Sequence, residues 1–248
     1  MTAVLVHGVP ETARLWDALR GELQRDDVVA LSLPGFGNPL PGGFEPTKDA
    51  YADWLIGEVE ALGRPVDLVG HDWGGGFALR LVSIRPDLVR TWVLDAAGMA
   101  DPDFAWHDFA RMWQTPGEGE AFMEGWLAAS PADKAATFGA GEEPSESVQA
   151  MAAAIDRTMT DAILTLYRSA VRTQDDWGDD FVDIPRPGLV LVPSEDPFLD
   201  GAAARRSATR AGAGVVDLEG QGHWWMLGDP SGAAQLLEAF WDETGDPS

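Results

Sequence analysis

The chain has 248 residues, 45% of them hydrophobic, with no cysteine and a net charge of −24 at pH 7. This length is enough for one sizeable buried core, and the absence of cysteine excludes disulfides and thiolate metal sites. A surface this acidic repels phosphate groups, which excludes nucleic acids and anionic membranes as partners. No apolar run is long enough to span a bilayer and the N-terminal residues do not resemble a signal peptide, so the sequence predicts a cytoplasmic protein.

The first part of the chain alternates between apolar runs and segments with helical periodicity. Four apolar runs predict buried strands, over residues 4–6, 28–31, 66–69 and 89–94. Apolar residues at helical spacing predict the helices that connect them, over about 14–24, 47–62 and 77–84. This order is typical of a parallel sheet with crossover helices.

The alternation stops after the fourth strand. Residues 99–182 contain no good strand, only helical segments rich in Trp, Met and Ala, interrupted by a loop over 139–147. Beyond them the alternation returns, with strands at 188–192 and 215–218 and helices at 202–210 and 231–241. The sequence therefore predicts an α/β core of residues 1–98 and 183–248, with residues 99–182 inserted as a helical cap.

The segment Gly70-His71-Asp72-Trp73-Gly74-Gly75 lies between the third predicted strand and the next helix. A nucleophile flanked by small residues at this place forms a sharp turn that lifts its side chain above the sheet, and Gly70 and Gly74 permit close approach of helix and strand. The nucleophile here is Asp72, whose carboxylate is ionised at neutral pH and can attack an sp³ carbon to form an alkyl ester. An Asp that merely caps the helix is the alternative, but such a cap does not need the surrounding glycines.

The alkyl ester must then be hydrolysed, which requires a base to activate water and an acid residue to orient that base. His223 follows the last predicted strand, and Asp196 follows the strand before it. The chain order Asp72, Asp196, His223 matches the order nucleophile, acid, histidine that accompanies such a turn, so these three are the predicted catalytic residues. Glu195 and Asp95, which also follow strands, remain alternatives for the acid.

A second conspicuous turn, His7-Gly8-Val9-Pro10, follows the first predicted strand. The backbone N–H groups of Val9 and Trp73 are predicted to form an oxyanion hole beside Asp72. None of the histidines has the spacing of a metal-ligand pair, so we expect no metal and no other cofactor.

The elbow at Asp72, the segment from His7-Gly8-Val9-Pro10-Glu11-Thr12 to Trp16, and Gly222-His223-Trp224 together resemble the epoxide hydrolase and haloalkane dehalogenase branch of the α/β-hydrolases. The resemblance covers nearly the whole chain, and the Asp in the elbow is its most specific element. It implies the α/β-hydrolase fold with a mostly parallel sheet. Members of these families usually have further strands before the His-Gly turn, whereas only six residues precede it here. A six-stranded sheet that lacks those N-terminal strands is therefore expected, with an exposed edge that leaves a homo-oligomer open.

Within this branch the leaving group decides the reaction, and Trp73 beside the nucleophile is common to both families. A departing halide needs a second N–H donor, which the resemblance places either on an Asn after His-Gly or on a Trp of the cap. Val9 occupies the first place, but the second stays open because the cap holds Trp106, Trp113, Trp126 and Trp177. Fluoroacetate dehalogenases also resemble this cap, but they carry an Arg after the nucleophile, where this chain has Trp73.

A departing epoxide oxygen needs a proton, because an alkoxide leaves poorly. Tyr167 lies in a stretch, residues 164–169, that resembles the one carrying the second of two oxygen-binding Tyr residues in epoxide hydrolases. Trp106-His107-Asp108-Phe109 resembles a stretch of some relatives in which His replaces the first Tyr. The resemblance therefore implies that His107 and Tyr167 bind and protonate the epoxide oxygen, while a purely structural role for each remains an alternative.

These inferences favour a hydrolase that opens an epoxide to a diol through an ester on Asp72. The Trp residues of the cap imply an apolar slot for a small neutral organic substrate, with His7, Trp73, Trp106 and Trp113 as its expected contacts. Two alternatives stay open: a haloalkane dehalogenase that releases halide from a small haloalkane, and a non-catalytic binding protein that has kept the fold.

Overall fold

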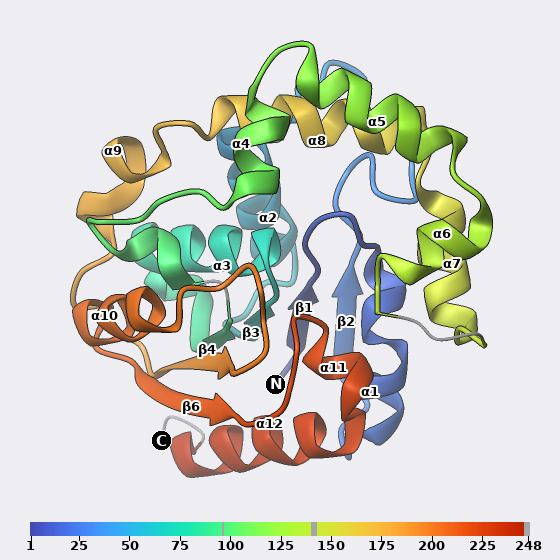
Figure 1. Ribbon diagram of the computed structural model, residues 1–248. Helices are drawn as coiled ribbons and strands as arrows, with labels where there is room; N and C mark the ends of the chain where they lie inside the picture. The colour runs from blue at the N-terminus through green and yellow to red at the C-terminus, as the bar shows by residue number, and fades with distance from the viewer. Residues whose placement is uncertain (96, 140–142, 246–248) are drawn as a thin grey trace.

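Six parallel strands form one central sheet (Figure 1) in the computed structural model, which describes residues 1–95, 97–139 and 143–245. The strands lie in the order β2-β1-β3-β4-β5-β6, and each neighbouring pair is parallel. They are β1 (Ala3–Val6), β2 (Val28–Leu31), β3 (Val66–Gly70), β4 (Val89–Leu94), β5 (Gly188–Pro193) and β6 (Gly214–Leu218). The six predicted strands are confirmed, each with its ends within one residue of the expectation.

The place of each strand in the sheet explains its composition. The inner strands β1, β3 and β5 are buried along their whole length and consist mainly of Val and Leu. A parallel strand that is covered on both faces needs apolar residues on both, so these strands read as continuous apolar runs. β2 and β6 lie at the two edges of the sheet and are both partly exposed.

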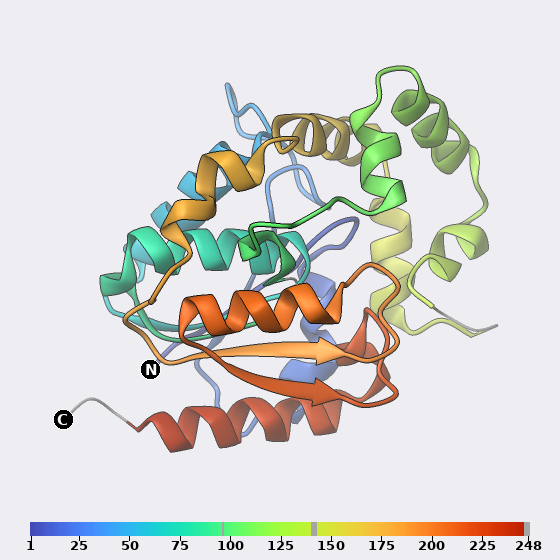
Figure 2. The same ribbon diagram turned by 60° about the vertical axis from the view of Figure 1, so that its left-hand side comes forward.

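Helices cover both faces of the sheet, as the two views in Figures 1 and 2 show. One face carries α2 (Lys48–Ala61), α3 (Trp73–Ile84) and α10 (Gly201–Ala211), and the other carries α1 (Asp17–Glu22), α11 (Trp225–Gly228) and α12 (Pro230–Thr244). The single helix expected over 14–24 is wrong in detail. The hydroxyl of Thr12 accepts the N–H of Arg14 and starts a tight 3-10 turn, Ala13–Trp16, before α1 begins.

Between β4 and β5 the described residues form helices and loops and no strand, as expected. After the short turn Ala97–Ala100 the helices are α4 (Asp108–Gln114), α5 (Glu118–Ala128), α6 (Pro131–Ala136), α7 (Glu146–Ala154), α8 (Arg157–Ser169) and α9 (Thr173–Trp177), followed by a 3-10 turn, Gly178–Asp180. The loop predicted over 139–147 is shorter, because Ser145 caps α7, and its residues 140–142 lie outside the described part of the chain.

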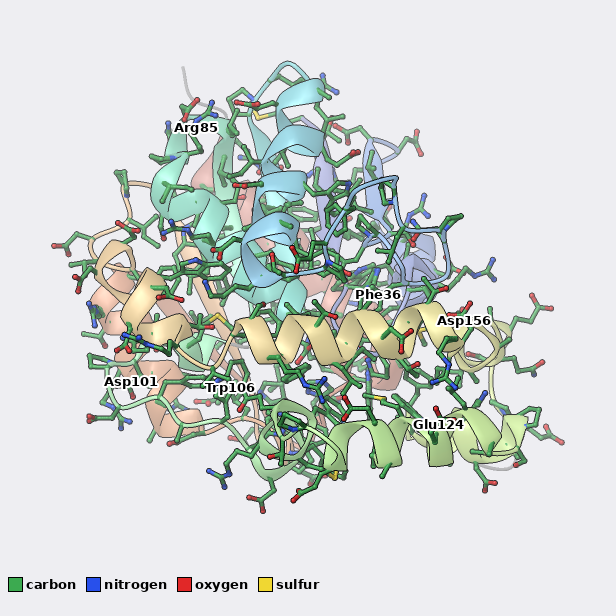
Figure 3. All side chains as sticks on the ribbon, turned by 90° about the horizontal axis from the view of Figure 1, so that it is seen from above. Phe36, Arg85, Asp101, Trp106, Glu124 and Asp156 are labelled. Atoms are coloured by element: carbon green, nitrogen blue, oxygen red, sulfur yellow. The ribbon has the colours of Figure 1, made fainter. Side chains whose placement is uncertain are left out.

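The α4–α9 segment lies above the ends of the strands, where α8 runs across the molecule with α5 beside it (Figures 1 and 3). Asp156 stands at the start of α8, and Trp106 near its other end (Figure 3). An ion pair between Arg157 and Glu124 joins α8 to α5, and Ser169 accepts the N–H of Lys48 at the start of α2. Across the described residues, none of the helices combines the length and the apolar character needed to cross a membrane.

Candidate active site

The turn between β3 and α3 has the geometry of a nucleophile elbow. Asp72 has φ 50° and ψ −123°, a backbone conformation that costs an L-residue about 1–3 kcal/mol and persists only where the surroundings fix it. A Cβ on Gly74 would collide with the backbone of Val6 and His7, so glycine is what lets α3 pack this closely on β1. Asp72 makes no side-chain hydrogen bond to the start of α3, and the interpretation as a simple helix cap is therefore wrong.

The carboxylate of Asp72 faces the turn that follows β1. The N–H of Val9 donates to Asp72 Oδ1 at 2.9 Å, and the N–H of Trp73 lies close enough to lower the pKa of this carboxyl. A Cβ on Gly8 would collide with the Asp72 side chain, which explains why Gly stands before Val9. The structure thus brings together, beside this carboxylate, the two N–H groups predicted for the oxyanion hole.

Burial sets the ionisation of Asp72. It raises the pKa of this carboxyl from 3.8 to about 6, although the charges of His223 and His71 counteract the rise. The carboxylate is therefore ionised at neutral pH and carries little water that would have to be removed before an attack.

His223 lies beside Asp72 and is held by Asp196. The Nδ1 of His223 donates to Asp196 Oδ2 at 2.8 Å, and Asp196 Oδ1 accepts the N–H of Phe198 at 2.8 Å. Glu195 is exposed, so of the acids considered from the sequence it is Asp196 that orients the histidine. Burial lowers the pKa of His223, but the hydrogen bond to Asp196 and the charges of Asp196 and Asp72 outweigh this and raise it.

A second buried histidine, His71, was not assigned a role from the sequence. Its Nδ1 lies 2.5 Å from Asp95 Oδ2 and its Nε2 lies 3.0 Å from Glu11 Oε1. Asp95, the other rival for the acid, is therefore bonded to His71 instead of His223. The sequence shows only that His71 precedes Asp72 and that Glu11 follows His7 by four residues. The contact between His71 and Glu11 is made by the fold.

Two adjoining hollows open above Asp72, with volumes of about 130 Å³ and about 320 Å³. They share the side chains that meet over the nucleophile, which are Asp72, His107, Tyr167, Phe198 and His223. The smaller is also lined by Trp73, Trp106, Asp103 and Asp200, and the larger by Val9, Phe109, Trp113, Phe122, Trp126 and Trp224. The predicted pair His107 and Tyr167 therefore lies in one space with Asp72.

Both members of this pair are neutral and carry a proton. The Nδ1 of His107 accepts the N–H of Ala110 at 3.2 Å and so caps α4, and burial lowers the pKa of His107. The neutral ring therefore holds its proton on Nε2. Burial, followed by the charge of Asp72, raises the pKa of the Tyr167 phenol, which stays protonated. The hollow above the nucleophile thus has two neutral hydrogen-bond donors.

The indole N–H groups of three cap Trp residues differ in their hydrogen-bond partners. Trp106 Nε1 donates to the carbonyl of Ala170 at 3.3 Å, and Trp177 Nε1 donates to Asp49 at 2.9 Å. Trp113 Nε1 is covered by protein and has no hydrogen-bond partner among the described residues. Trp106 and Trp113 line the hollow with their rings, but neither presents a free N–H to it.

His7 does not reach the substrate position. It is fully buried, its Nε2 accepts the N–H of Leu33 at 3.0 Å, and its Nδ1 lies 2.8 Å from the carbonyl of Gly8. Neither hollow is lined by His7. The predicted contact between His7 and the substrate is therefore not supported, because this ring links the turn after β1 to the turn after β2.

Glu11, His71 and His223 also offer ligand atoms within 4.8 Å of one another, a distance compatible with a metal site. A hydrogen bond between Glu11 and His71 accounts for the proximity of these two. The Nε2 of His71 faces Glu11, and Glu11 also accepts from Trp224, so a metal ion would have to displace these bonds.

The chain belongs to the alpha/beta hydrolase family, whose family model matches residues 3–236. Among its curated relatives is (E)-2-((N-methylformamido)methylene)succinate hydrolase of Acinetobacter baylyi, to which it is 25% identical. The alignment covers 97% of this chain and 90% of the relative. These findings confirm an α/β-hydrolase with the fold expected from the sequence.

Solved structures resemble the chain over nearly its whole length. NosK from Streptomyces actuosus has a TM-score of 0.71 and 26% identity, with 99% of both chains covered. The haloalkane dehalogenase DbeA from Bradyrhizobium elkani has a TM-score of 0.70 and 21% identity, with 96% of this chain and 90% of that one covered. Neighbours with different reactions share this fold, so the choice of reaction rests on the site.

Proposed function

We propose that this protein is an epoxide hydrolase that works through an alkyl ester on Asp72. Oδ2 of Asp72 attacks the less hindered ring carbon, the C–O bond to that carbon breaks, and its electron pair moves to the oxygen. A proton from His107 or Tyr167 converts this oxygen to a hydroxyl. The first step therefore leaves a hydroxyalkyl ester on Asp72.

The observation that carries this proposal is the pair of neutral donors above the nucleophile. His107 and Tyr167 line both hollows together with Asp72, and the pKa directions of both keep them protonated where they are needed. An epoxide oxygen becomes an alkoxide in the transition state and must be protonated, whereas a halide only needs to be solvated. A site with two proton donors therefore fits an epoxide better than a haloalkane.

The second step is the hydrolysis of the ester by His223. Its Nε2 takes a proton from water, and the hydroxide attacks the carbonyl carbon of the Asp72 ester. The N–H groups of Val9 and Trp73 bind the oxyanion that forms on the Asp72 carbonyl oxygen. The intermediate collapses to the Asp72 carboxylic acid, and the departing diol oxygen takes the proton from His223. The proton left on Asp72 balances the one that the donor pair gave up. Esterification removes the negative charge of Asp72 that raises the pKa of His223, so this pKa falls and the ring is left in the neutral form that can accept a proton from water.

The lining of the site favours a neutral substrate. Asp103, Asp196 and Asp200 line the smaller hollow, and neither Lys nor Arg is among the described residues that line either hollow. The Acinetobacter relative acts on a succinate derivative, which carries carboxylates. A site without cations would bind such an anion poorly, so we propose a small neutral, largely apolar epoxide.

The α4–α9 segment serves in this proposal as a cap over the core. It supplies His107 and Tyr167 and most of the aromatic lining, whereas Asp72, Asp196 and His223 come from loops after strands. We propose that residues 1–98 and 183–248 form the core and residues 99–182 the cap.

A panel of neutral epoxides and haloalkanes of matched size tests the proposal. The expected result is diol formation without halide release, with the Asp72→Asn variant as the control for enzyme-catalysed turnover. Halide release without diol formation would contradict it. If wild-type protein binds members of the panel but converts none of them, the alternative of a non-catalytic binding protein is favoured instead.

A haloalkane dehalogenase is the second candidate, because Trp73 lies beside the nucleophile and Trp113 Nε1 has no partner among the described residues. Trp106 is the more exposed of the two cap indoles, but its N–H already binds Ala170. Replacing Trp113 by Phe keeps an aromatic ring and removes the unpaired indole N–H. We expect at most a few-fold loss of diol formation, whereas a dehalogenase that used this N–H would lose about 10²-fold.

A further inference from the structure

A buried charge cluster lies directly beneath the nucleophile, and the mechanism above does not use it. It consists of Glu11, His71 and Asp95, whose side chains are at most 3% exposed. Glu11 follows β1, His71 follows β3 and Asp95 follows β4, and these strands are neighbours in the sheet. The cluster therefore lies at the centre of the edge on which the site is built.

Both ring nitrogens of His71 face a carboxylate. Nδ1 lies 2.5 Å from Asp95 and Nε2 lies 3.0 Å from Glu11. A neutral imidazole has only one N–H, so it could not donate to both ionised carboxylates. The two carboxylates outweigh the cost of burial and raise the pKa of His71 well above its ordinary value. His71 is therefore a buried imidazolium.

Each carboxylate of the cluster also holds a part of the active site. Asp95 Oδ1 accepts the backbone N–H of Asp72 at 2.9 Å, and so fixes the strained elbow. Glu11 Oε2 accepts the N–H of Gly8 at 2.8 Å, and so fixes the turn that presents the N–H of Val9.

The loop that carries the catalytic base is tied to the same two carboxylates. The indole of Trp224 donates to Glu11 at 2.6 Å, and the indole of Trp225 donates to Asp95 at 2.6 Å. These residues directly follow His223, whose ring centroid lies 4.5 Å from that of His71. The elbow, the oxyanion turn and the histidine loop are thus all bonded to one ion cluster.

We propose that His71 is a positioning residue, which joins Glu11 and Asp95 and thereby fixes the nucleophile, the oxyanion hole and the catalytic histidine relative to one another. The role of these loops in catalysis rests on the proposed function. His71 itself touches neither hollow and takes no part in bond making.

The cluster also acts on the ionisation of the catalytic groups. The groups that face Asp72 are His223, Glu11, His71 and Tyr167, and those that face His223 include His71, Asp196 and Asp72. The cation on His71 lowers the pKa of both Asp72 and His223. Glu11 raises the pKa of Asp72. Removing the cation or the anion of the cluster should therefore shift the pH profile in opposite directions.

The test uses His71→Gln and Glu11→Gln in the full chain, with Asp67→Asn as the matched control. Asp67 is also a fully buried carboxylate in an ion cluster, with Arg25 and Arg90, but it lies on β3 away from the elbow. We expect both test variants to lose about 10²-fold in kcat with little change in KM, because the groups are misplaced by a fraction of an ångström to 1 Å. The acid limb of kcat/KM should move to higher pH in His71→Gln and to lower pH in Glu11→Gln. Asp67→Asn should lower thermal stability and leave that limb in place.

A measurement without substrate separates this inference from the proposed function. With ¹⁵N-labelled histidine, both ring nitrogens of His71 should remain protonated from about pH 5 to about pH 8, although a free histidine titrates in this range. A His71 that titrates there would overturn the inference, as would folded variants that lose activity with no shift of the acid limb. If wild-type protein opens no epoxide, the proposed function fails while the ring signals still decide the state of His71.

Discussion

The floor of the hollow above Asp72 consists of loops at the ends of parallel strands, whereas its roof consists of helices that pack through aromatic side chains. The floor consists of two hydrogen-bonded pairs, Val9 with Asp72 at 2.9 Å and His223 with Asp196 at 2.8 Å. Tyr167, on α8, and His107, which caps α4, come from the roof. Packing against Trp113 places the Tyr167 ring, and a single hydrogen bond from Ala110 places the His107 ring. In the proposed function the floor supplies the carboxylate nucleophile, and the roof decides which bond is cleaved.

The largest expected effect concerns the floor. Asp72→Asn removes the nucleophile, and we expect kcat to fall by about 10⁴-fold or more.

The same substitution should stabilise the fold at neutral pH. Burial raises the pKa of Asp72 from 3.8 to about 6, so the folded state loses stability as pH rises through this range, and the variant escapes that loss. The gain is on the order of 1–3 kcal/mol above about pH 6, measurable by denaturant unfolding. An equal loss of stability would contradict the assignment.

The next effect separates the two neighbouring acids after β5. Asp196→Asn removes the acceptor that holds the Nδ1–H of His223, and kcat should fall by about 10²–10⁴-fold through slower hydrolysis of the ester. Glu195→Gln is the matched control, because this exposed residue does not bind the histidine. Single-turnover kinetics should show accumulation of the ester only in the Asp196 variant. Equal losses in both variants would remove Asp196 from the triad.

The roof should show a smaller effect. Tyr167→Phe removes one proton donor and keeps the ring, and His107→Ser removes the other while Ser can still cap α4. We expect each to lower the rate of ester formation by about 10–10²-fold, and the double variant to lose more than either. Rapid-quench measurement of ester formation reports this step directly. Unchanged rates in both single variants would show that the roof only shapes the cavity.

The smallest expected effect is the change of kcat/KM for each pH unit. Attack requires ionised Asp72, whose pKa lies at about 6, so kcat/KM should fall about tenfold for each pH unit below that value. Thermal unfolding at each pH serves as the control for loss of fold. A profile that stays flat below pH 5 would mean that the group titrating at about 6 is not the nucleophile.

The contrast between floor and roof also explains what could be predicted from the sequence. The elbow and the order of Asp72, Asp196 and His223 follow from backbone rules that leave a short local pattern, so the sequence was enough to place them. The hydrogen bond from Trp106 to Ala170 and the burial of the Trp113 indole depend on how the helices pack, which no local pattern encodes.

Contacts across the fold were the hardest to foresee. His7 stands in the His-Gly turn after β1 but accepts a hydrogen bond from Leu33, because the neighbouring strand β2 ends beside it. Glu11 and His71 are 60 residues apart, and only the pairing of β1 with β3 brings them into contact.

The most direct test of the central claim is the covalent intermediate. His223→Gln should still allow attack by Asp72 but should stop hydrolysis of the ester. After incubation with a neutral epoxide that wild-type protein converts, mass spectrometry should find one intact epoxide added to the peptide containing Asp72, and none added in Asp72→Asn. The whole mass of the epoxide is retained, whereas a haloalkane would lose its halide. An epoxide that wild-type protein converts but that leaves no adduct on Asp72 in His223→Gln would contradict the account.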